Sequence, residues 1–169
     1  MLQLSTLIKH HAQFRPDRVA VVFEQERLTW QQFEVRVRRC ARLLSWLGVR
    51  KGDRVATALS NCRELLEVYW AVPSIGAVLV PLSPLLMPSG LASLLRDSGA
   101  NCLVSQRSMA PMLDQARQEL PGLAADHVLM VDGASGDYPD YASMLKTCPE
   151  GAVDAPAMRS DDLFNIMYT

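Results

Sequence analysis

The chain has 169 residues, of which 49% are apolar and 21% are charged, a composition that supports one compact domain with a buried core. The formal net charge of −1 excludes the basic balance expected of a nucleic-acid-binding protein. Cys40, Cys62, Cys102 and Cys148 are widely spaced and form no Cys-x-x-Cys pair, so we expect buried free thiols in a reducing compartment.

The N-terminal region predicts one helix and one strand. Residues 4–14 carry apolar side chains at helical spacing, which indicates a short amphipathic helix. His10 and His11 interrupt any long apolar run, so we expect no secretory signal here. Residues 19–23 predict a strand, and residues 24–27 a polar, hairpin-like link.

A long helix follows this link. Thr29 is its predicted N-cap, Gln32 occupies the capping-box position, and Gly48 closes the helix. Its inward face is predicted to consist of Phe33, Val37, Cys40, Ala41, Leu44 and Leu47. Its outer surface is rich in arginine at positions 36, 38, 39 and 42. We interpret this surface as a solvated helix face, with a site for an anionic partner as the alternative.

The stretch from 52 to 84 reads as strand, helix and strand, and the rest of the chain is organised around it. Residues 55–59 form the first predicted strand, and Asn61 is the predicted cap of the helix, with Glu64 reaching back to it. Residues 77–80 form the second strand, which we expect Pro81 to stop. Two parallel strands joined by one helix require a right-handed crossover and helices on both faces.

The remaining residues continue the alternation of helix and strand. The predicted elements are helix 89–98, strand 101–105, helix 108–120, strand 127–131, helix 141–145 and strand 163–168. Residues 68–95 carry no charge, but prolines and glycines break them repeatedly, which favours buried strand and loop over a membrane span. The pattern predicts an α/β fold with a mostly parallel sheet flanked by helices. We divide the chain into residues 1–50 (helix, strands and long helix), 51–146 (α/β core), 147–162 (linker) and 163–169 (final strand).

Isolated candidates for chemistry are weak. His10 and His11 point in different directions on a helix, and His127 lies on a predicted strand without a partner, so we expect no metal site. Ser143 and Lys146 match a Ser-x-x-Lys pattern, but the motifs that accompany it in penicillin-recognising enzymes are absent. The sequence has no Gly-x-Gly-x-x-Gly and no Walker loop, which argues against autonomous nucleotide binding.

Three blocks of sequence together resemble the AMP-forming acyl-CoA synthetases and related adenylate-forming enzymes. They are Pro-Asp-Arg-Val-Ala at 16–20, Leu-Thr-Trp-Gln-Gln-Phe at 28–33, and residues 51–84 with Gly-Asp-Arg-Val, Gly-Ala-Val and Val-Pro-Leu. Family members often have Asn after Pro-Leu, where this chain has Ser83. The resemblance implies the N-terminal subdomain of the acyl-CoA synthetase-like fold.

Residues 161–169 resemble the lead-in to the family's Ser/Thr/Gly-rich phosphate loop, of which only Tyr168 and Thr169 would be present. The resemblance implies that Thr169 contacts an ATP phosphate or Mg²⁺ in the complete enzyme, and that no catalytic residue and no metal ligand lies in this chain. We therefore interpret the chain as a truncated N-terminal portion whose final strand leads into the absent loop.

The resemblance implies an ATP-dependent ligase of fatty acid metabolism, of the long-chain fatty-acid–CoA ligase type, that joins a carboxylic acid to CoA. ATP, Mg²⁺ and CoA would serve the parent enzyme, with none of them binding this fragment, which we expect to be inactive alone. Two alternatives stay open: an adenylating enzyme that loads a carrier protein, and a non-catalytic α/β interaction or dimerisation module. We expect a cytoplasmic protein, with peripheral membrane contact and a homodimer as further options, no transmembrane segment and no nucleic-acid partner.

Overall fold

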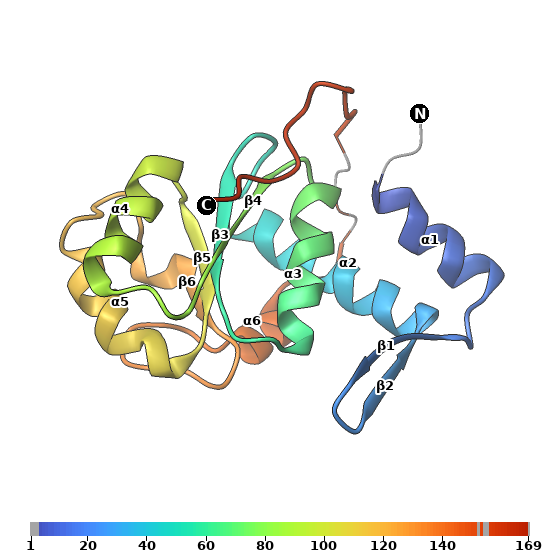
Figure 1. Cartoon of the computed structure of the whole chain (residues 1–169). Helices are drawn as coiled ribbons and strands as arrows, with labels where there is room; N and C mark the ends of the chain where they lie inside the picture. The colour runs from blue at the N-terminus through green and yellow to red at the C-terminus, as the bar shows by residue number, and fades with distance from the viewer. Residues whose placement is uncertain (1–3, 152, 154–155, 169) are drawn as a thin grey trace.

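The computed structural model describes residues 4–151, 153 and 156–168 (Figure 1). The helices are α1 (Leu4–Phe14), α2 (Trp30–Trp46), α3 (Arg63–Ser74), α4 (Pro88–Ser98), α5 (Ala110–Arg117) and α6 (Tyr141–Thr147), with short 3₁₀ turns at Arg107–Met109 and Ala125–His127. The strands are β1 (Val19–Phe23), β2 (Glu26–Thr29), β3 (Arg54–Ala58), β4 (Val78–Leu82), β5 (Cys102–Ser105) and β6 (Val128–Met130).

Four of the strands form one parallel sheet in the order β4-β3-β5-β6. Helices α2, α3 and α6 lie on one face of this sheet, and α4 and α5 lie on the other (Figure 1). Side chains alternate between the two faces, so Val55 joins the core under α2 and α3 while Ala56 joins the core under α4 and α5. The predicted α/β fold with a mostly parallel, helix-flanked sheet is therefore confirmed.

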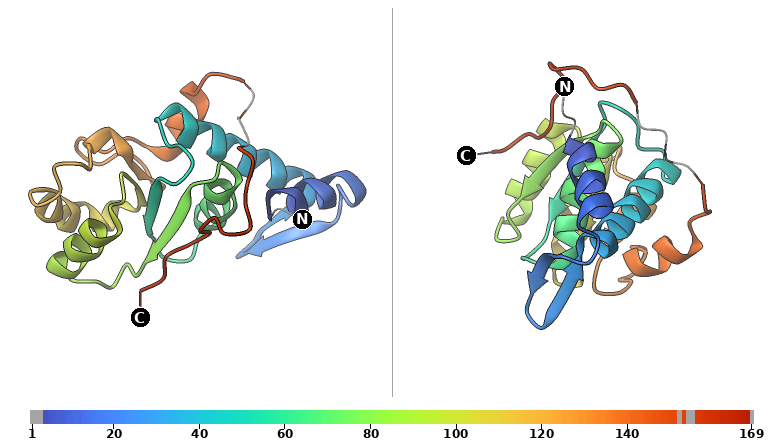
Figure 2. Two further views of the ribbon diagram at one scale, coloured as in Figure 1. Left: turned by 90° about the horizontal axis from the view of Figure 1, so that it is seen from above. Right: turned by 90° about the vertical axis from the view of Figure 1, so that its right-hand side faces the viewer.

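The N-terminal elements lie beside this core. Helix α1 packs on α2 and α3, and β1 and β2 form an antiparallel hairpin near the start of α2 (Figures 1 and 2). The hairpin turn is Glu24-Gln25, with Glu24 in the left-handed region at φ 51°. No helix in the described ranges is long and apolar enough to cross a membrane.

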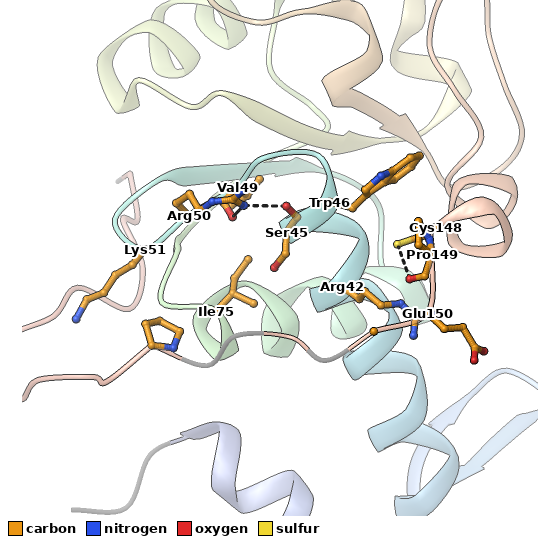
Figure 3. A pocket seen from close by; sticks show the side chains of 12 residues that line it. Arg42, Ser45, Trp46, Val49, Arg50, Lys51, Ile75, Cys148, Pro149 and Glu150 are labelled. Atoms are coloured by element: carbon orange, nitrogen blue, oxygen red, sulfur yellow. Dashed lines mark hydrogen bonds between the residues drawn. The ribbon is translucent and has the colours of Figure 1, made fainter.

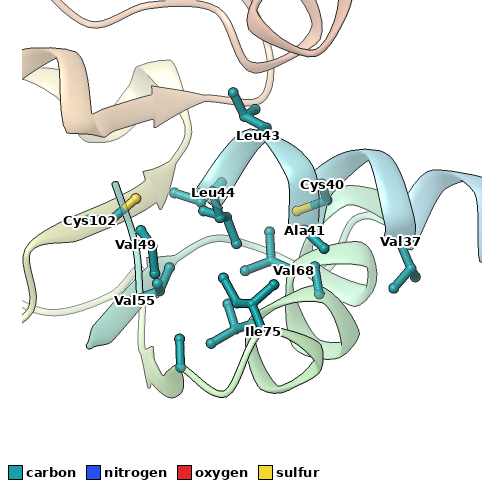
Figure 4. Close-up of a cluster of buried hydrophobic side chains, with 14 of the residues drawn as sticks. Val37, Cys40, Ala41, Leu43, Leu44, Val49, Val55, Val68, Ile75 and Cys102 are labelled. Carbon is teal, nitrogen blue, oxygen red and sulfur yellow. The ribbon is translucent and has the colours of Figure 1, made fainter. Parts of the chain in front are cut away.

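Helix α2 begins as its sequence predicts. The Gln32 amide N–H donates to Thr29 Oγ1 at 3.3 Å, and the Thr29 N–H donates to Gln32 Oε1 at 2.9 Å, which completes a capping box. The buried face of α2 then packs against α3 and the sheet, with Cys40, Ala41 and Leu44 facing Val68 (Figure 4). Local capping and apolar periodicity thus agree with tertiary packing in this helix.

The cap of α3 differs from the prediction. The N-cap is Cys62, whose Sγ accepts a hydrogen bond from the Leu65 N–H at 3.4 Å, and Asn61 lies outside the helix. Because Cys62 is the N-cap, Glu64 stands one position short of the capping-box position, and its carboxylate accepts from Arg63 Nη2 at 2.7 Å. The Glu64 carboxylate is therefore engaged in an ion pair with Arg63 and not in a capping box.

Pro81 does not end β4, contrary to the prediction. It pairs with Thr57 inside the ladder between β3 and β4. The Val78 N–H donates to the Asp53 carbonyl, and strand alternation then turns the nitrogens of residues 79 and 81 away from β3, toward the open edge of the sheet. A proline is compatible with an edge strand at such a position because no ladder hydrogen bond is lost.

Residues 163–168 are not a regular strand, which corrects a third prediction. They form one isolated parallel bridge, in which the Leu79 N–H donates to Phe164 O at 3.1 Å and the Ile166 N–H donates to Leu79 O at 2.8 Å. The next donor toward this segment would be the nitrogen of Pro81, which has no hydrogen. The same proline that β4 tolerates at its edge therefore prevents the segment from extending the sheet.

The proposed division of the chain into four segments stays a prediction.

Candidate functional site

The carboxyl edge of the parallel sheet is the first place to look for a ligand site, because open α/β sheets bind ligands there. Gln106, just after β5, accepts a hydrogen bond from the Ser60 N–H at 2.9 Å and donates to Ser108 Oγ at 2.8 Å. Asp132, after β6, accepts from the Arg107 N–H at 2.7 Å. These bonds join the loops after three strands into one connected rim.

The polar groups of this rim are already satisfied by protein partners. Ser105 Oγ, for example, donates to the Ala58 carbonyl at 3.0 Å and is fully buried. None of the buried polar atoms that lack a partner in the described residues belongs to the rim. Among the described residues, the rim therefore contains no buried, unpaired polar atom that would mark a ligand position.

The segment before the predicted phosphate loop lies along β4, next to this edge. Lys51 Nζ holds it through Asp162 Oδ2 at 2.6 Å, and Tyr168 Oη donates to Asp97 Oδ2 of α4 at 2.7 Å. Hydrogen bonds from the Arg159 N–H and Lys51 hold the pKa of Asp162 below its usual range. Thr169, the one predicted cofactor-binding residue, lies outside the described residues, so its contact with ATP or Mg²⁺ stays a prediction.

The other sequence candidates have packing roles. The His11 ring stacks on Trp30 with centroids 4.4 Å apart, and His127 Nδ1 lies 3.1 Å from the Asn101 carbonyl. Ser143 belongs to the cap of α6, where its N–H and hydroxyl both donate to Asp140, at 2.8 and 2.6 Å. In the described ranges, no three His, Cys, Asp or Glu side chains form a group that could hold a metal ion.

Sequence reasoning missed a buried carboxylate on α3. Glu67 is 0% exposed, accepts a hydrogen bond from Arg36 Nε on α2, and accepts another from Tyr141 Oη on α6 at 3.0 Å. Arg63 Nε lies 3.7 Å from the same carboxylate. Burial raises the pKa of Glu67, and the bonds from Arg36 and Tyr141 offset only part of this effect. The network ties α2, α3 and α6 together through both oxygens of the Glu67 carboxylate.

One hollow lies at the C-terminal end of α2, on the face of the sheet that α2, α3 and α6 cover. Its volume is about 600 Å³, and its walls come from α2, the loop 49–51, Ile75 and the segment after α6 (Figure 3). Trp46 contributes an apolar wall, and Arg50 Nη1 donates to the Ser45 carbonyl at 2.8 Å. A second cavity of about 460 Å³ shares Arg42, Cys148 and Glu150 with it and extends between α2 and α6. Neither cavity is lined by the rim residues Ser60, Gln106, Ser108 or Asp132.

The fold and the edge segment define a helix-flanked, parallel α/β unit of the kind that presents ligands at its carboxyl edge. The AMP-binding enzyme family model matches residues 8–169, and the chain therefore belongs to the AMP-binding enzyme family.

Named relatives and solved structures agree with this family. The chain is 30% identical over 146 residues to a crotonobetaine/carnitine–CoA ligase of Escherichia coli, an alignment that covers 85% of this chain and 28% of that ligase. A similar ligase of Salmonella typhi is 28% identical, with 90% of this chain and 31% of that protein covered. This chain thus spans less than a third of the length of these curated relatives.

Among solved structures, a protein described as a long-chain-fatty-acid CoA ligase from Rhodopseudomonas palustris superposes with a TM-score of 0.87 at 28% identity, covering 99% of this chain and 42% of that one. The inhibitor-bound N-terminal domain of FACL13 from Mycobacterium tuberculosis superposes with a TM-score of 0.82 at 28% identity, covering 100% of this chain and 41% of that one. Both place this chain within the N-terminal part of the ligase fold.

Proposed function

We propose that this chain forms the N-terminal part of an ATP-dependent, AMP-forming carboxylic acid–CoA ligase. The observation that carries the proposal is the family match over residues 8–169, together with relatives named as CoA ligases over the same region. In the complete enzyme, a carboxylate would attack the α-phosphate of ATP to form an acyl-adenylate and release pyrophosphate. The thiol of CoA would then take the acyl group and release AMP. We propose a fatty or related carboxylic acid as its substrate.

The role of this chain in that enzyme would be to build one wall of the large domain. The rim bonds among Ser60, Gln106 and Ser108 fix the loops at the carboxyl edge, and the bridge at Asn165 sets the path of the segment beside β4. ATP, Mg²⁺ and CoA would then bind mainly to residues outside those described. Thr169 would contribute one contact to an ATP phosphate or to Mg²⁺.

Two other functions make different predictions. An adenylating enzyme that loads a carrier protein would form the same acyl-adenylate but would not make acyl-CoA. A non-catalytic α/β interaction or homodimerisation module would do neither. A cytoplasmic location, with or without peripheral membrane contact, belongs to the same proposal.

The test assays the chain alone and the product of the open reading frame that encodes it. Each is given ATP, Mg²⁺ and a panel of carboxylic acids of increasing length, and acid-dependent ATP–pyrophosphate exchange and acyl-CoA formation are measured. We expect both activities from the reading-frame product and neither from the isolated chain. Exchange without thioester would indicate carrier-protein loading, and the absence of both from the reading-frame product would indicate the interaction module.

Thr169 is tested in the reading-frame product with a matched control. We expect T169A to lower kcat/KM for MgATP and T169S to restore most of it, because a hydroxyl contact survives in serine. The control is T147A, since among the described residues the Thr147 hydroxyl bonds only to carbonyls of its own helix, at 3.2 Å from Ser143 O and from Met144 O. Equal kinetics for T169A and T147A would remove Thr169 from the nucleotide site.

A further inference from the structure

Cationic side chains line the second cavity, on the face of the sheet that α2, α3 and α6 cover. It measures about 460 Å³ and lies among α2, the first turn of α3, α6 and the segment that follows α6. Five cations line it, namely Arg36, Arg39, Arg42, Arg63 and Lys146, against the two carboxylates of Glu67 and Glu150. Because the whole chain has a net charge of −1, this positive charge is a local concentration and not a general property of the surface.

Two of these cations are already neutralised inside the protein. Arg36 pairs with Glu67, and Arg63 pairs with Glu64 and with Glu26. Their guanidinium groups are therefore held in place by carboxylates on neighbouring elements. Arg36 and Arg63 therefore form a fixed wall of the cavity, and their charges are already balanced by carboxylates.

The other three cations have no such partner. No ion pair of 4.0 Å or less joins Arg39, Arg42 or Lys146 to a carboxylate in the part of the chain that the structure describes. Arg42 Nε is also buried and has no hydrogen-bond partner among the same residues. A buried charged donor without an acceptor is unfavourable, so an acceptor brought by a ligand would stabilise this arrangement.

The geometry of the donors indicates the class of ligand. Guanidinium groups present paired N–H donors that match the oxygens of phosphate, and Arg39 and Arg42, three positions apart on α2, both line this cavity. The site is a cavity of the size that holds a small molecule, which disfavours an extended polyanion as its occupant. From these observations we infer that the cavity among α2, α3 and α6 binds the phosphate group of a small phosphorylated molecule, through Arg39, Arg42 and Lys146.

This inference is independent of the proposed ligase function. The cavity is lined by helices on one face of the sheet, whereas the proposed nucleotide site lies at the carboxyl edge. It also revises the first interpretation of the arginine-rich surface of α2. Arg38 does not line the cavity and pairs with Glu34 at 3.3 Å, whereas Arg39, which is exposed as well, lines the cavity and has no ion pair among the described residues.

The test follows the arginine Nε–Hε resonances of the chain during titration with inorganic phosphate, with sodium chloride of equal ionic strength as the reference. We expect saturable shifts for Arg42 and Arg39 and none for Arg38. In R42Q and in R39Q, the affinity for phosphate should fall about tenfold or more, while R38Q should bind as the wild type does. The backbone amide spectrum of each variant reports whether it is folded.

Two results would overturn the inference. The first is a wild-type titration in which phosphate shifts Arg38 as much as Arg42, or shifts neither with saturation. The second comes from vesicles of phosphatidylserine, compared with vesicles of phosphatidylcholine. Binding to the anionic vesicles without any response to soluble phosphate would identify a membrane surface instead of a small-molecule site.

Discussion

Replacing Glu67 with alanine tests the buried network that joins α2, α3 and α6. Glu67 is 0% exposed, and it accepts hydrogen bonds from Arg36 and from Tyr141, itself only 2% exposed. Removing one partner of a buried ion pair costs about 3–5 kcal/mol. We expect the lower end, about 3 kcal/mol, because the Arg36 side chain is 32% exposed and can be rehydrated, whereas the Tyr141 hydroxyl cannot.

The assay is urea unfolding at pH 7, with thermal unfolding as a second measure. A loss of about 3 kcal/mol in a chain of this size corresponds to a fall in Tm of about 6–12 °C. The matched control is E34A, which removes an i,i+4 pair with Arg38 on the surface of α2 and should cost about 0.3–0.5 kcal/mol. If E67A costs no more than E34A, the network does not hold the three helices together, and the reasoning is wrong.

Three further predictions concern stability. Burial raises the pKa of Glu67 in the folded state, so the folded chain binds a proton at this carboxyl group more tightly than the unfolded chain does. The stability that the protonated carboxyl group contributes is therefore lost as pH rises through the raised pKa. Urea unfolding from pH 4 to 7 should show the wild type losing stability relative to E67Q as pH rises, and parallel curves would contradict this. T29A removes one half of the capping box and should lower the free energy of unfolding in urea by about 1 kcal/mol. An unchanged midpoint of urea unfolding would contradict this. G99A should cost about 1–2 kcal/mol of unfolding free energy, because Gly99 has φ 61° and the added Cβ would lie 2.6 Å from Arg54 Nη2. G122A serves as the control, since Gly122 has open space around it. Similar losses in both variants would refute the strain argument.

Local signals in the sequence determined most of the elements. The Thr29 and Gln32 pair predicted the start of α2, because both partners of a capping box lie within one helical turn. Gly99 marked the end of α4, where the backbone turns left-handed at φ 61°. Short apolar runs between turn residues located the four strands of the parallel sheet, since strands buried on both faces must be apolar throughout. The three sequence blocks also indicated the family.

Tertiary structure decided what depends on neighbours that are distant in the chain. The strand order placed β4 at the edge, and only there can Pro81 remain inside a strand while preventing residues 163–168 from pairing further. Helix packing buried Glu67, because Arg36 and Tyr141 reach it from elements that lie 31 and 74 positions away in the sequence. The same packing brought arginines of α2 beside Lys146 of α6 to form one cavity. Hydrophobic periodicity indicates which side of a helix or strand faces the core, but it does not indicate which charged side chains meet there. The Glu67 network and the cavity beside Lys146 therefore followed from the fold alone.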